Sequence, residues 1–408
     1  MFEYPYILNK IFDKLNNYNI KPIIVGGYLR DWFLDIESKD IDIELYGISS
    51  LEKLEKILQE FGSVNSVGKS FGVVKLNYRD LDLDFSLPRR DSKTALGHKG
   101  FDIEVDTTLD FKSAASRRDF TINSMGYDVI ERRVLDPFHG VKDLKNSLLR
   151  AVDLKKFGED PLRLLRGVAF ASRFNLKFEP QLFKLSKEMI EDGVLKQLPR
   201  ERIYGEIEKI LLKSPKPSIA FKLLKELGAF NYFNEFKKLS PSSFKKVLNA
   251  LDNYKHLKKR EVDMALMLAI LSSEFTKEDR ESFLERITNN KSLLKIIDTL
   301  HTIRFNSDNF SDYSLYILAT QIDIELYIHY KEAFGDKDLK SLYKRAKELN
   351  ILNKRVTPLI GGKELISLGM QPSKEFHSLL QKIYDAQLRG EFTTKDEAIR
   401  WIKARLLS

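Results

Sequence analysis

The stretch Val25-Gly-Gly-Tyr-Leu-Arg-Asp31 is followed nine residues later by Asp40-Ile-Asp-Ile-Glu44. This pattern predicts a strand ending in two glycines, a short helix, and a second strand with Asp40, Asp42 and Glu44 on one face, since strand side chains alternate. Glycines let a backbone approach phosphates closely, and amides at a helix start attract anions. The stretch therefore predicts a phosphate-binding turn beside paired carboxylates, which is typical of metal-dependent enzymes that act on nucleotides.

The composition is that of a globular protein of two to four domains. With 408 residues, 43% of them hydrophobic, the chain can bury a substantial core. The absence of cysteine excludes disulfides and cysteine–zinc sites and fits a reducing cytoplasm. The longest apolar run, 264–271, is far shorter than a membrane span, and the first residues lack a signal-peptide pattern. We expect a soluble cytoplasmic protein.

The net charge of +9 suits an acidic partner such as nucleic acid, although many basic proteins bind none. The six histidines are scattered, and no His-Asp dipeptide occurs. The net charge therefore favours an acidic partner, but it does not indicate which reaction the protein catalyses.

Periodicity predicts a mixed α/β region followed by a long helical region. The predicted elements are a helix at 7–18, strands at 21–25 and 41–46, a helix at 50–61 capped by Ser50, a hairpin of 68–76 with 81–85, an exposed loop at 90–110, a basic helix start at 116–118 leading into an apolar strand, and a turn at 136–143. Beyond about residue 145 the strand signals nearly vanish, and prolines separate helical patterns to the end of the chain.

Two acidic pairs, Asp40 with Asp42 and Asp82 with Asp84, alternate with apolar residues. If the two strands were neighbours, several carboxylates would meet in one place, as Mg²⁺ prefers. Alone, either pair is more typical of a solvated strand face. Coupled to the Gly-Gly turn, the pairs favour the metal site.

Gly26-Gly27 alone is weak evidence, because tight turns use glycine routinely. Arg30, one helical turn later, strengthens the interpretation because it could reach a triphosphate, and Asp31 would orient it. Arg117-Arg118-Asp119 could bind phosphate and a sugar hydroxyl, or could be a solvated helix terminus.

The segment Glu159-Asp-Pro-Leu-Arg-Leu-Leu-Arg166 places Asp160 and Arg163 three residues apart, so that they face similarly on a helix. Cytosine and adenine both present an exocyclic amine beside a ring-nitrogen acceptor, whereas uracil and guanine present a carbonyl beside an N–H. An aspartate acceptor beside an arginine donor could therefore accept C and A and reject U and G. Asp160 before Pro161 is equally a good helix cap followed by a first-turn proline. Both interpretations stay open.

Together these residues resemble the class II tRNA nucleotidyltransferase family, which contains the CCA-adding enzymes and bacterial poly(A) polymerases; the chain is most like a bacterial CCA-adding enzyme without an HD domain. The matching motifs, in the family's order, are Gly26-Gly-Tyr-Leu-Arg-Asp31 with Asp40-Ile-Asp42, Arg117-Arg-Asp-Phe-Thr-Ile-Asn123, Asp136-Pro-Phe-His-Gly140 with Asp143-Leu144, Glu159 to Arg166, Pro199-Arg-Glu-Arg202 with Glu206, and the C-terminal Leu359-Ile-Gly-Gly-Lys-Glu-Leu with Leu368-Gly-Met-Gln-Pro372.

The resemblance implies an α+β nucleotidyltransferase head, with a mixed β-sheet and helices, followed by an all-α neck, body and tail. The expected domains are the catalytic head at 1–145, the nucleobase-reading neck at 146–215, the helical body at 216–350 and the tRNA-binding tail at 351–408.

The resemblance also implies the site. Asp40 and Asp42 would bind Mg²⁺, with Asp84 as the third catalytic carboxylate. Asp160 and Arg163 would read the incoming base in place of a template. The full set of nucleotide-binding residues would be Gly26, Gly27 and Arg30 around the triphosphate, Arg117, Arg118, Asp119 and Asn123 around the phosphates and ribose, and Asp160, Arg163 and Arg166 in the neck.

Two features indicate the branch of the family that the chain resembles, and one position departs from the family pattern. Gly68-Lys-Ser-Phe-Gly72 has the nucleotidyltransferase form of a signature that differs in the polymerases. The stretch 90–116 is full length, so adenine addition should be possible. One position departs from the family: Ala169 stands where members often carry an arginine, with Arg173 four residues beyond.

We therefore expect template-independent addition of CMP and AMP from CTP and ATP to the 3′ end of tRNA, with release of pyrophosphate. The partners would be the tRNA acceptor arm, CTP and ATP, without a membrane, and the protein would be a monomer or homodimer. Addition of A alone or poly(A) synthesis stays open. A catalytically silent RNA-binding protein is a third possibility, against which the retained Asp40, Asp42, Asp84, Asp160 and Arg163 argue.

Overall fold

The computed structural model describes residues 2–65, 72–93, 101–257, 264–337, 339–354, 356–372 and 375–406. The chain divides into two compact units, Met1–Lys237 and Lys238–Ser408. The predicted division into four domains stays a prediction.

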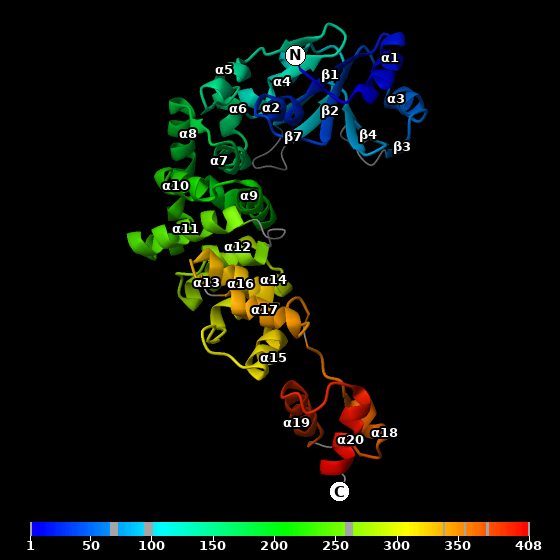
Figure 1. Cartoon of the computed structure of the whole chain (residues 1–408). Helices are drawn as coiled ribbons and strands as arrows, with labels where there is room; N and C mark the ends of the chain where they lie inside the picture. Colours follow the sequence, from blue (N-terminus) through cyan, green and yellow to red (C-terminus); the bar gives the residue numbers. More distant parts are fainter. Residues whose placement is uncertain are drawn as a thin grey trace. The chain divides into compact units, whose positions relative to one another are not determined.

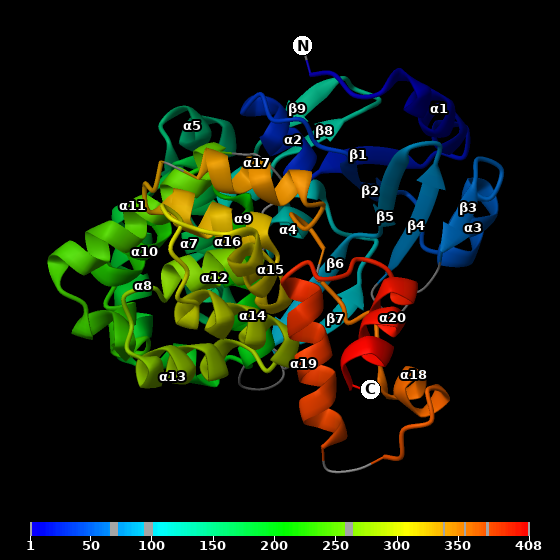
Figure 2. The same ribbon diagram turned by 60° about the horizontal axis from the view of Figure 1, so that its bottom comes forward.

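A mixed sheet forms the centre of the first unit (Figure 1). In the described ranges it contains seven strands in the order β3-β4-β5-β2-β1-β8-β9. Their bounds are β1 Lys21–Val25, β2 Asp40–Tyr46, β3 Ser63–Asn65, β4 Val73–Tyr78, β5 Leu81–Ser86, β8 Gly126–Asp128 and β9 Arg133–Leu135. Strands β2 and β5 pair in parallel, and the other neighbours pair antiparallel. Figure 2 shows β1, β2, β5 and β4 side by side.

The alternation in β2 and β5 fixes which face enters the core. Ile41, Ile43, Leu83 and Phe85 are buried, because each lies between polar neighbours that point to the opposite face. The acidic residues of both strands therefore share the other face of the sheet, which is the arrangement that the sequence predicts.

Short helices surround the sheet in the first part of this unit. They are η1 Tyr6–Leu8, α1 Asn9–Asn17, α2 Gly27–Phe33, α3 Leu51–Leu58, α4 Phe111–Ala115, η3 Thr121–Asn123 and α5 Gly140–Lys145. Ser50 caps α3 by accepting a hydrogen bond from the backbone N–H of Lys53, as predicted. The hairpin of β4 and β5 is also confirmed.

The remainder of this unit is helical apart from the two-residue strands β10 Leu148–Leu149 and β11 Lys177–Phe178. Its helices are α6 Leu154–Gly158, α7 Leu162–Phe174, α8 Pro180–Glu191, η4 Val194–Gln197, α9 Arg200–Lys213, α10 Ser218–Glu226, η5 Ala229–Asn231 and the start of η6 Asn234–Lys238. Helix α7 packs against α9 and α10.

In the described ranges the second unit consists of helices and connecting loops, without a strand. It contains α11 Pro241–Leu257, α12 Met264–Leu271, α13 Lys277–Ile287, α14 Lys291–Thr302, α15 Asp312–Gln321, α16 Ile324–Ala333, α17 Lys340–Glu348, α18 Gly362–Ser367, α19 Phe376–Leu388 and α20 Lys395–Leu406. The last three helices share a small core that includes Leu365, Ile383, Phe392 and Ile402. An α+β head followed by a helical remainder is thus confirmed. No helix in the described ranges combines the length and the apolar character that a membrane crossing requires.

Three local predictions need correction. The predicted loop at 90–110 contains two antiparallel strands, β6 Arg89–Lys93 and β7 Phe101–Val105. Arg117 and Arg118 follow the end of α4 instead of starting a helix. The predicted turn at 136–143 already enters α5, because Asp136 accepts hydrogen bonds from the backbone N–H groups of Gly140 and Val141. Residues 66–71, which include the first four positions of the Gly68–Gly72 signature, and residues 94–100 lie outside the described residues.

Candidate functional site

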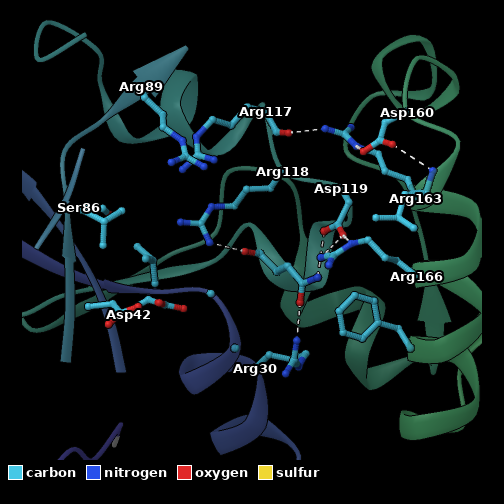
Figure 3. A pocket seen from close by; sticks show the side chains of 18 residues that line it. Arg30, Asp42, Ser86, Arg89, Arg117, Arg118, Asp119, Asp160, Arg163 and Arg166 are labelled. Atoms are coloured by element: carbon cyan, nitrogen blue, oxygen red, sulfur yellow. Dashed lines mark hydrogen bonds and ion pairs between the residues drawn. The ribbon is translucent and has the colours of Figure 1, made fainter. Parts of the chain in front are cut away.

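One cavity of about 560 Å³ in the first unit brings together residues that are far apart in the sequence. Sheet residues line one side and α7 lines the other, with Asp42 opposite Asp160, Arg163 and Arg166 (Figure 3). Of the residues that the sequence assigns to the site, the cavity is lined by Gly26, Gly27, Arg30, Asp42, Asp84, Arg117, Arg118, Asp119, Asn123, Asp160, Arg163 and Arg166. Asp40 is not among the lining residues.

The carboxylates meet because β2 and β5 run in register. Asp40 pairs with Asp82, and Asp42 pairs with Asp84. Burial raises the pKa of Asp42, and the Asp84 and Asp40 carboxylates raise it further against the opposing charge of Arg118. Lys75 on β4 donates from Nζ to Asp84 Oδ2 at 2.6 Å. This edge of the cavity is therefore crowded with negative charge that a cation would relieve.

These carboxylates fit Mg²⁺, which is bound by one or two carboxylates together with water and substrate phosphates. Within the described part of the chain, no three His, Cys, Asp or Glu side chains converge on a closed metal cage. Asp42 and Asp84 thus offer a partial set of oxygen ligands that leaves room for a phosphate.

The glycine turn lies directly beside Asp42. Gly26 has φ +73°, and a Cβ atom there would lie 3.2 Å from both Arg118 Nη1 and Asp42 Oδ2. A Cβ on Gly27 would lie 3.3 Å from Arg30 Nη2. Glycine is needed here for the backbone conformation and for the space between the acid and the arginines.

Arg30 is buried and held on several sides. Its Nε and Nη2 donate to Asp31 Oδ1 at 2.8 and 2.6 Å, and its Nη1 donates to Asn123 Oδ1 at 2.6 Å. Its guanidinium also lies over the rings of Phe170 and Phe174, with centroid distances of 5.3 and 4.5 Å. Asp31 orients Arg30, as the sequence suggests, and Arg30 connects α2 with α7.

Arg117 and Arg118 are anchored by a carboxylate beneath them. Glu44 is fully buried, and its Oε2 lies 3.5 Å from Arg117 Nη2 and 3.7 Å from Arg118 Nη2. Arg118 also donates from Nη1 to the backbone carbonyl of Asn123 at 3.0 Å. Glu44 therefore faces the arginines and supports their position in the cavity wall.

Asp119 joins the sheet region to helix α7 through Arg166. Its Oδ2 accepts a hydrogen bond from Arg166 Nε at 2.8 Å and forms an ion pair with Arg166 Nη2 at 2.7 Å. Its Oδ1 accepts from Asn123 Nδ2 and the Phe120 N–H. Burial alone would raise the pKa of Asp119, but the Arg166 charge and these hydrogen bonds outweigh burial and lower it. Asp119 is thus held as a carboxylate.

Asp160 and Arg163 face one another at the start of α7. Asp160 Oδ1 accepts from the backbone N–H of Leu162 at 3.0 Å, so the carboxylate does cap the helix. Asp160 Oδ2 lies 3.9 Å from Arg163 Nε, and Arg163 donates from Nη2 to the Arg117 carbonyl at 2.8 Å. One oxygen of Asp160 serves the cap, and the other faces Arg163.

Ser86, Arg89 and Phe170 are among the lining residues that the sequence did not identify. Ser86 continues the alternation of Asp82 and Asp84, which is a signal that could have found it. Arg89 follows β5, and only the path of the chain into β6 brings it to the cavity. Phe170 lies one turn after Arg166, where an aromatic residue is typical of a helix core.

Residues 23–150 match the family described as "Poly A polymerase head domain", and residues 175–239 match that described as "Probable RNA and SrmB- binding site of polymerase A". A relative from Neisseria gonorrhoeae named "Multifunctional CCA protein" is 34% identical over 207 residues, which cover 50% of this chain and 48% of the relative. The chain therefore spans about half the length of the curated relatives it matches.

Solved structures share the fold over nearly the whole chain. The structure of a CCA-adding enzyme in apo form II has a TM-score of 0.71 and 24% identity, and the match covers 99% of this chain and 97% of that one. The Thermotoga maritima CCA-adding enzyme complexed with tRNA has a TM-score of 0.63 and 24% identity, with 99% and 96% covered. At this identity the likeness establishes the fold.

Proposed function

We propose that this chain, whose residues 23–150 and 175–239 match the two poly(A) polymerase families described above, is a class II nucleotidyltransferase that adds CMP and AMP from CTP and ATP to the 3′ end of tRNA. The head domain supplies the nucleotidyl-transfer site, and the names of the relatives motivate the choice of CCA addition. The chain would consist of four domains: head 1–145, neck 146–215, body 216–350 and tail 351–408. The tail would bind the acceptor arm of the tRNA.

The observation that carries this proposal is the convergence of two chemistries in one cavity. Asp42 and Asp84 line one side, and Asp160 and Arg163 line the other. Cationic side chains from the head lie between them, as a triphosphate requires. A nucleotide would therefore extend from the base-reading helix to the carboxylates.

In the transfer step, the terminal 3′-oxygen of the RNA attacks the α-phosphorus of the nucleotide. The new bond joins this oxygen to the α-phosphorus, and the bond from the α-phosphorus to the bridging oxygen of the β-phosphate breaks, releasing pyrophosphate. The hydroxyl proton passes to Asp84 or to water. Bound Mg²⁺, held by Asp42 and Asp40 with Asp84, would lower the pKa of the hydroxyl and offset the charge of the leaving pyrophosphate.

Arg117 and Arg118 hold the phosphates in this proposal, and Asp119 with Asn123 holds the ribose side. Arg30 does not bind the triphosphate in this proposal, because its donors already contact Asp31 and Asn123. We assign it to holding the glycine turn, Gly26 and Gly27, against α7.

Asp160 and Arg163 select the base. The Asp160 oxygen that faces Arg163 accepts from the exocyclic amine of C or A, and Arg163 donates to the adjacent ring nitrogen. Uracil and guanine would present a carbonyl to the carboxylate and an N–H to the guanidinium, which leaves polar groups unpaired. Arg166 supports this pair by its contact with Asp119.

A primer-extension assay with Mg²⁺ tests the proposal. The substrates are one tRNA that lacks CCA and one that ends in CC, each with a single nucleoside triphosphate. CMP addition to the first and AMP addition to the second are expected. Extension only of the CC-ending tRNA would reduce the function to A addition, long A tracts on any RNA would indicate a poly(A) polymerase, and RNA binding without extension would indicate a catalytically silent protein.

A further inference from the structure

A second pocket of about 230 Å³ lies behind the nucleotide cavity, between α7 and α9. It shares Arg30, Arg166 and Phe170 with that cavity, and it also includes Arg173, Lys209 and Lys213. The carboxylates of β2 and β5 do not line it. The second pocket thus adjoins the site of transfer without containing the residues proposed for the metal.

Positive charge exceeds negative charge in the second pocket. Five cationic side chains line it, against the single carboxylate of Glu206. Glu206 is buried and already accepts a hydrogen bond from Lys209 Nζ at 2.8 Å. Arg166 is likewise engaged, by Asp119. Glu206 and Asp119 are therefore already paired with Lys209 and Arg166.

Arg173 and Lys213 are the two cations of this pocket that no carboxylate holds at hydrogen-bond distance in the described ranges. Arg173 Nη2 forms only a long ion pair with Asp31 Oδ2, at 3.7 Å, and the charge of Asp31 is shared with Arg30, which donates two hydrogen bonds to Oδ1. Burial lowers the pKa of Arg30, and the nearby charge of Arg173 lowers it further despite Asp31. Lys213 is exposed at the end of α9 and forms no ion pair with any residue in the described ranges. An anion would relieve the repulsion among these groups.

We propose that the second pocket binds a backbone phosphate of the RNA strand whose 3′ end enters the nucleotide cavity. This inference rests on the proposed function. Lys209 and Lys213 lie in α9, within the segment 175–239 that matches the RNA-binding family. Arginine and lysine are the side chains that contact RNA phosphates. Lys213 is exposed and Arg173 is partly exposed, so that both can be reached by a strand.

The released pyrophosphate is the other anion with this chemistry. It would leave from the carboxylate side of the cavity together with its cation, and the second pocket offers one carboxylate, Glu206, which Lys209 already neutralises. An RNA phosphate needs no accompanying divalent cation. The charge pattern therefore favours the strand over the product.

The test compares two double variants with equal loss of charge in the full chain. Arg173→Gln/Lys213→Gln removes the two cations that no carboxylate holds at hydrogen-bond distance, and Lys184→Gln/Lys187→Gln removes two exposed cations from α8. The probe is a labelled acceptor-stem RNA hairpin ending in CC, bound without nucleotide and followed by fluorescence anisotropy at several salt concentrations. The KM for ATP and inhibition by pyrophosphate are measured in parallel.

For the pocket variant we expect a Kd for the hairpin about 10-fold higher, and a slope of log Kd against log salt that is smaller by about one to two. The KM for ATP and inhibition by pyrophosphate should match those of the α8 variant. An unchanged Kd for the hairpin, or weaker pyrophosphate inhibition with an unchanged Kd, would overturn the inference.

Two comparisons keep the outcomes distinct. If the double variant does not fold, the single variant Lys213→Gln is measured instead, because Lys213 is exposed and its replacement should not affect folding. Its Kd for the hairpin should rise about 3-fold. A wild-type chain that binds the hairpin with the predicted salt dependence but extends no RNA would contradict the proposed function and leave the phosphate site standing. Normal extension with no binding defect in either variant would contradict the phosphate site alone.

Discussion

Asp42 and Asp84 are direct partners across the parallel strands β2 and β5, and both line the cavity that we propose to bind the nucleotide. Their register follows from the alternation of acidic and apolar residues in both strands, because shifting either strand by one residue would turn its isoleucines or leucines into the cavity. The pair therefore depends on the core beneath it.

Asp42→Asn should reduce the rate of nucleotidyl transfer by at least about 10³-fold, because several kcal/mol of charge stabilisation would be lost. Binding of the RNA hairpin should change little, since Asp42 lies on the opposite side of the cavity from α7. Single-turnover transfer and hairpin anisotropy measure the two quantities. Asp80→Asn, at an exposed position before β5, is the matched control, and near-normal transfer by Asp42→Asn would contradict the metal assignment.

Two substitutions at Asp160 separate helix capping from base selection. Asn caps a helix about as well as Asp, whereas Ala loses about 1 kcal/mol. We therefore expect Asp160→Asn to keep the stability of the wild type and still relax the preference for C and A over U and G, because its amide can donate as well as accept. Denaturant unfolding and competition among the four nucleotides report the two effects. Unchanged base preference in a destabilised Asp160→Ala would reduce Asp160 to a cap.

Asp119 should make stability depend on pH. Its pKa in the folded chain lies below its ordinary value of 3.8, so its contribution is present above about pH 4 and is lost as the pH falls further. Asp119→Asn should lower the free energy of unfolding by about 2 kcal/mol at pH 7, less than for a fully buried pair because Arg166 is 35% exposed. The difference between wild type and variant should shrink below pH 4. A difference independent of pH would contradict the ion pair with Arg166.

Gly26→Ala should impair the site as well as the fold. Its positive φ angle disfavours alanine by about 1–3 kcal/mol, and the new Cβ would press on Asp42 and Arg118 at 3.2 Å. We expect a higher KM for nucleotide and slower transfer. Gly205→Ala in α9 is the control, because a Cβ there meets nothing within 4 Å and alanine favours a helix. Equal activity of the two variants would exclude a role for the close approach at Gly26.

The sequence predicted the parts of the site that short-range rules govern. Alternation gave the face of Asp42 and Asp84, and three-residue spacing paired Asp160 with Arg163. It did not predict the contacts that depend on tertiary packing. Arg30 lies over Phe170 and Phe174 only because α7 packs against the head.

The strands at Arg89–Lys93 and Phe101–Val105 were missed for a related reason. The first of them, Arg-Arg-Asp-Ser-Lys, contains no β-branched or aromatic residue, so its own propensity does not favour a strand. Its conformation comes from pairing with β7. The sequence did not predict the second pocket either. Arg173 and Lys213 are far apart in the chain, and only the packing of α7 against α9 places them around one cavity.

The most direct measurement is mass spectrometry of a tRNA that lacks its last three nucleotides after incubation with the protein, Mg²⁺ and all four nucleoside triphosphates. We predict a single product longer by C, C and A, with C alone added when ATP is omitted and no U or G in any product. A tRNA that stays unextended under every condition, or that gains U and G as readily as C and A, would contradict the addition of CCA by this chain.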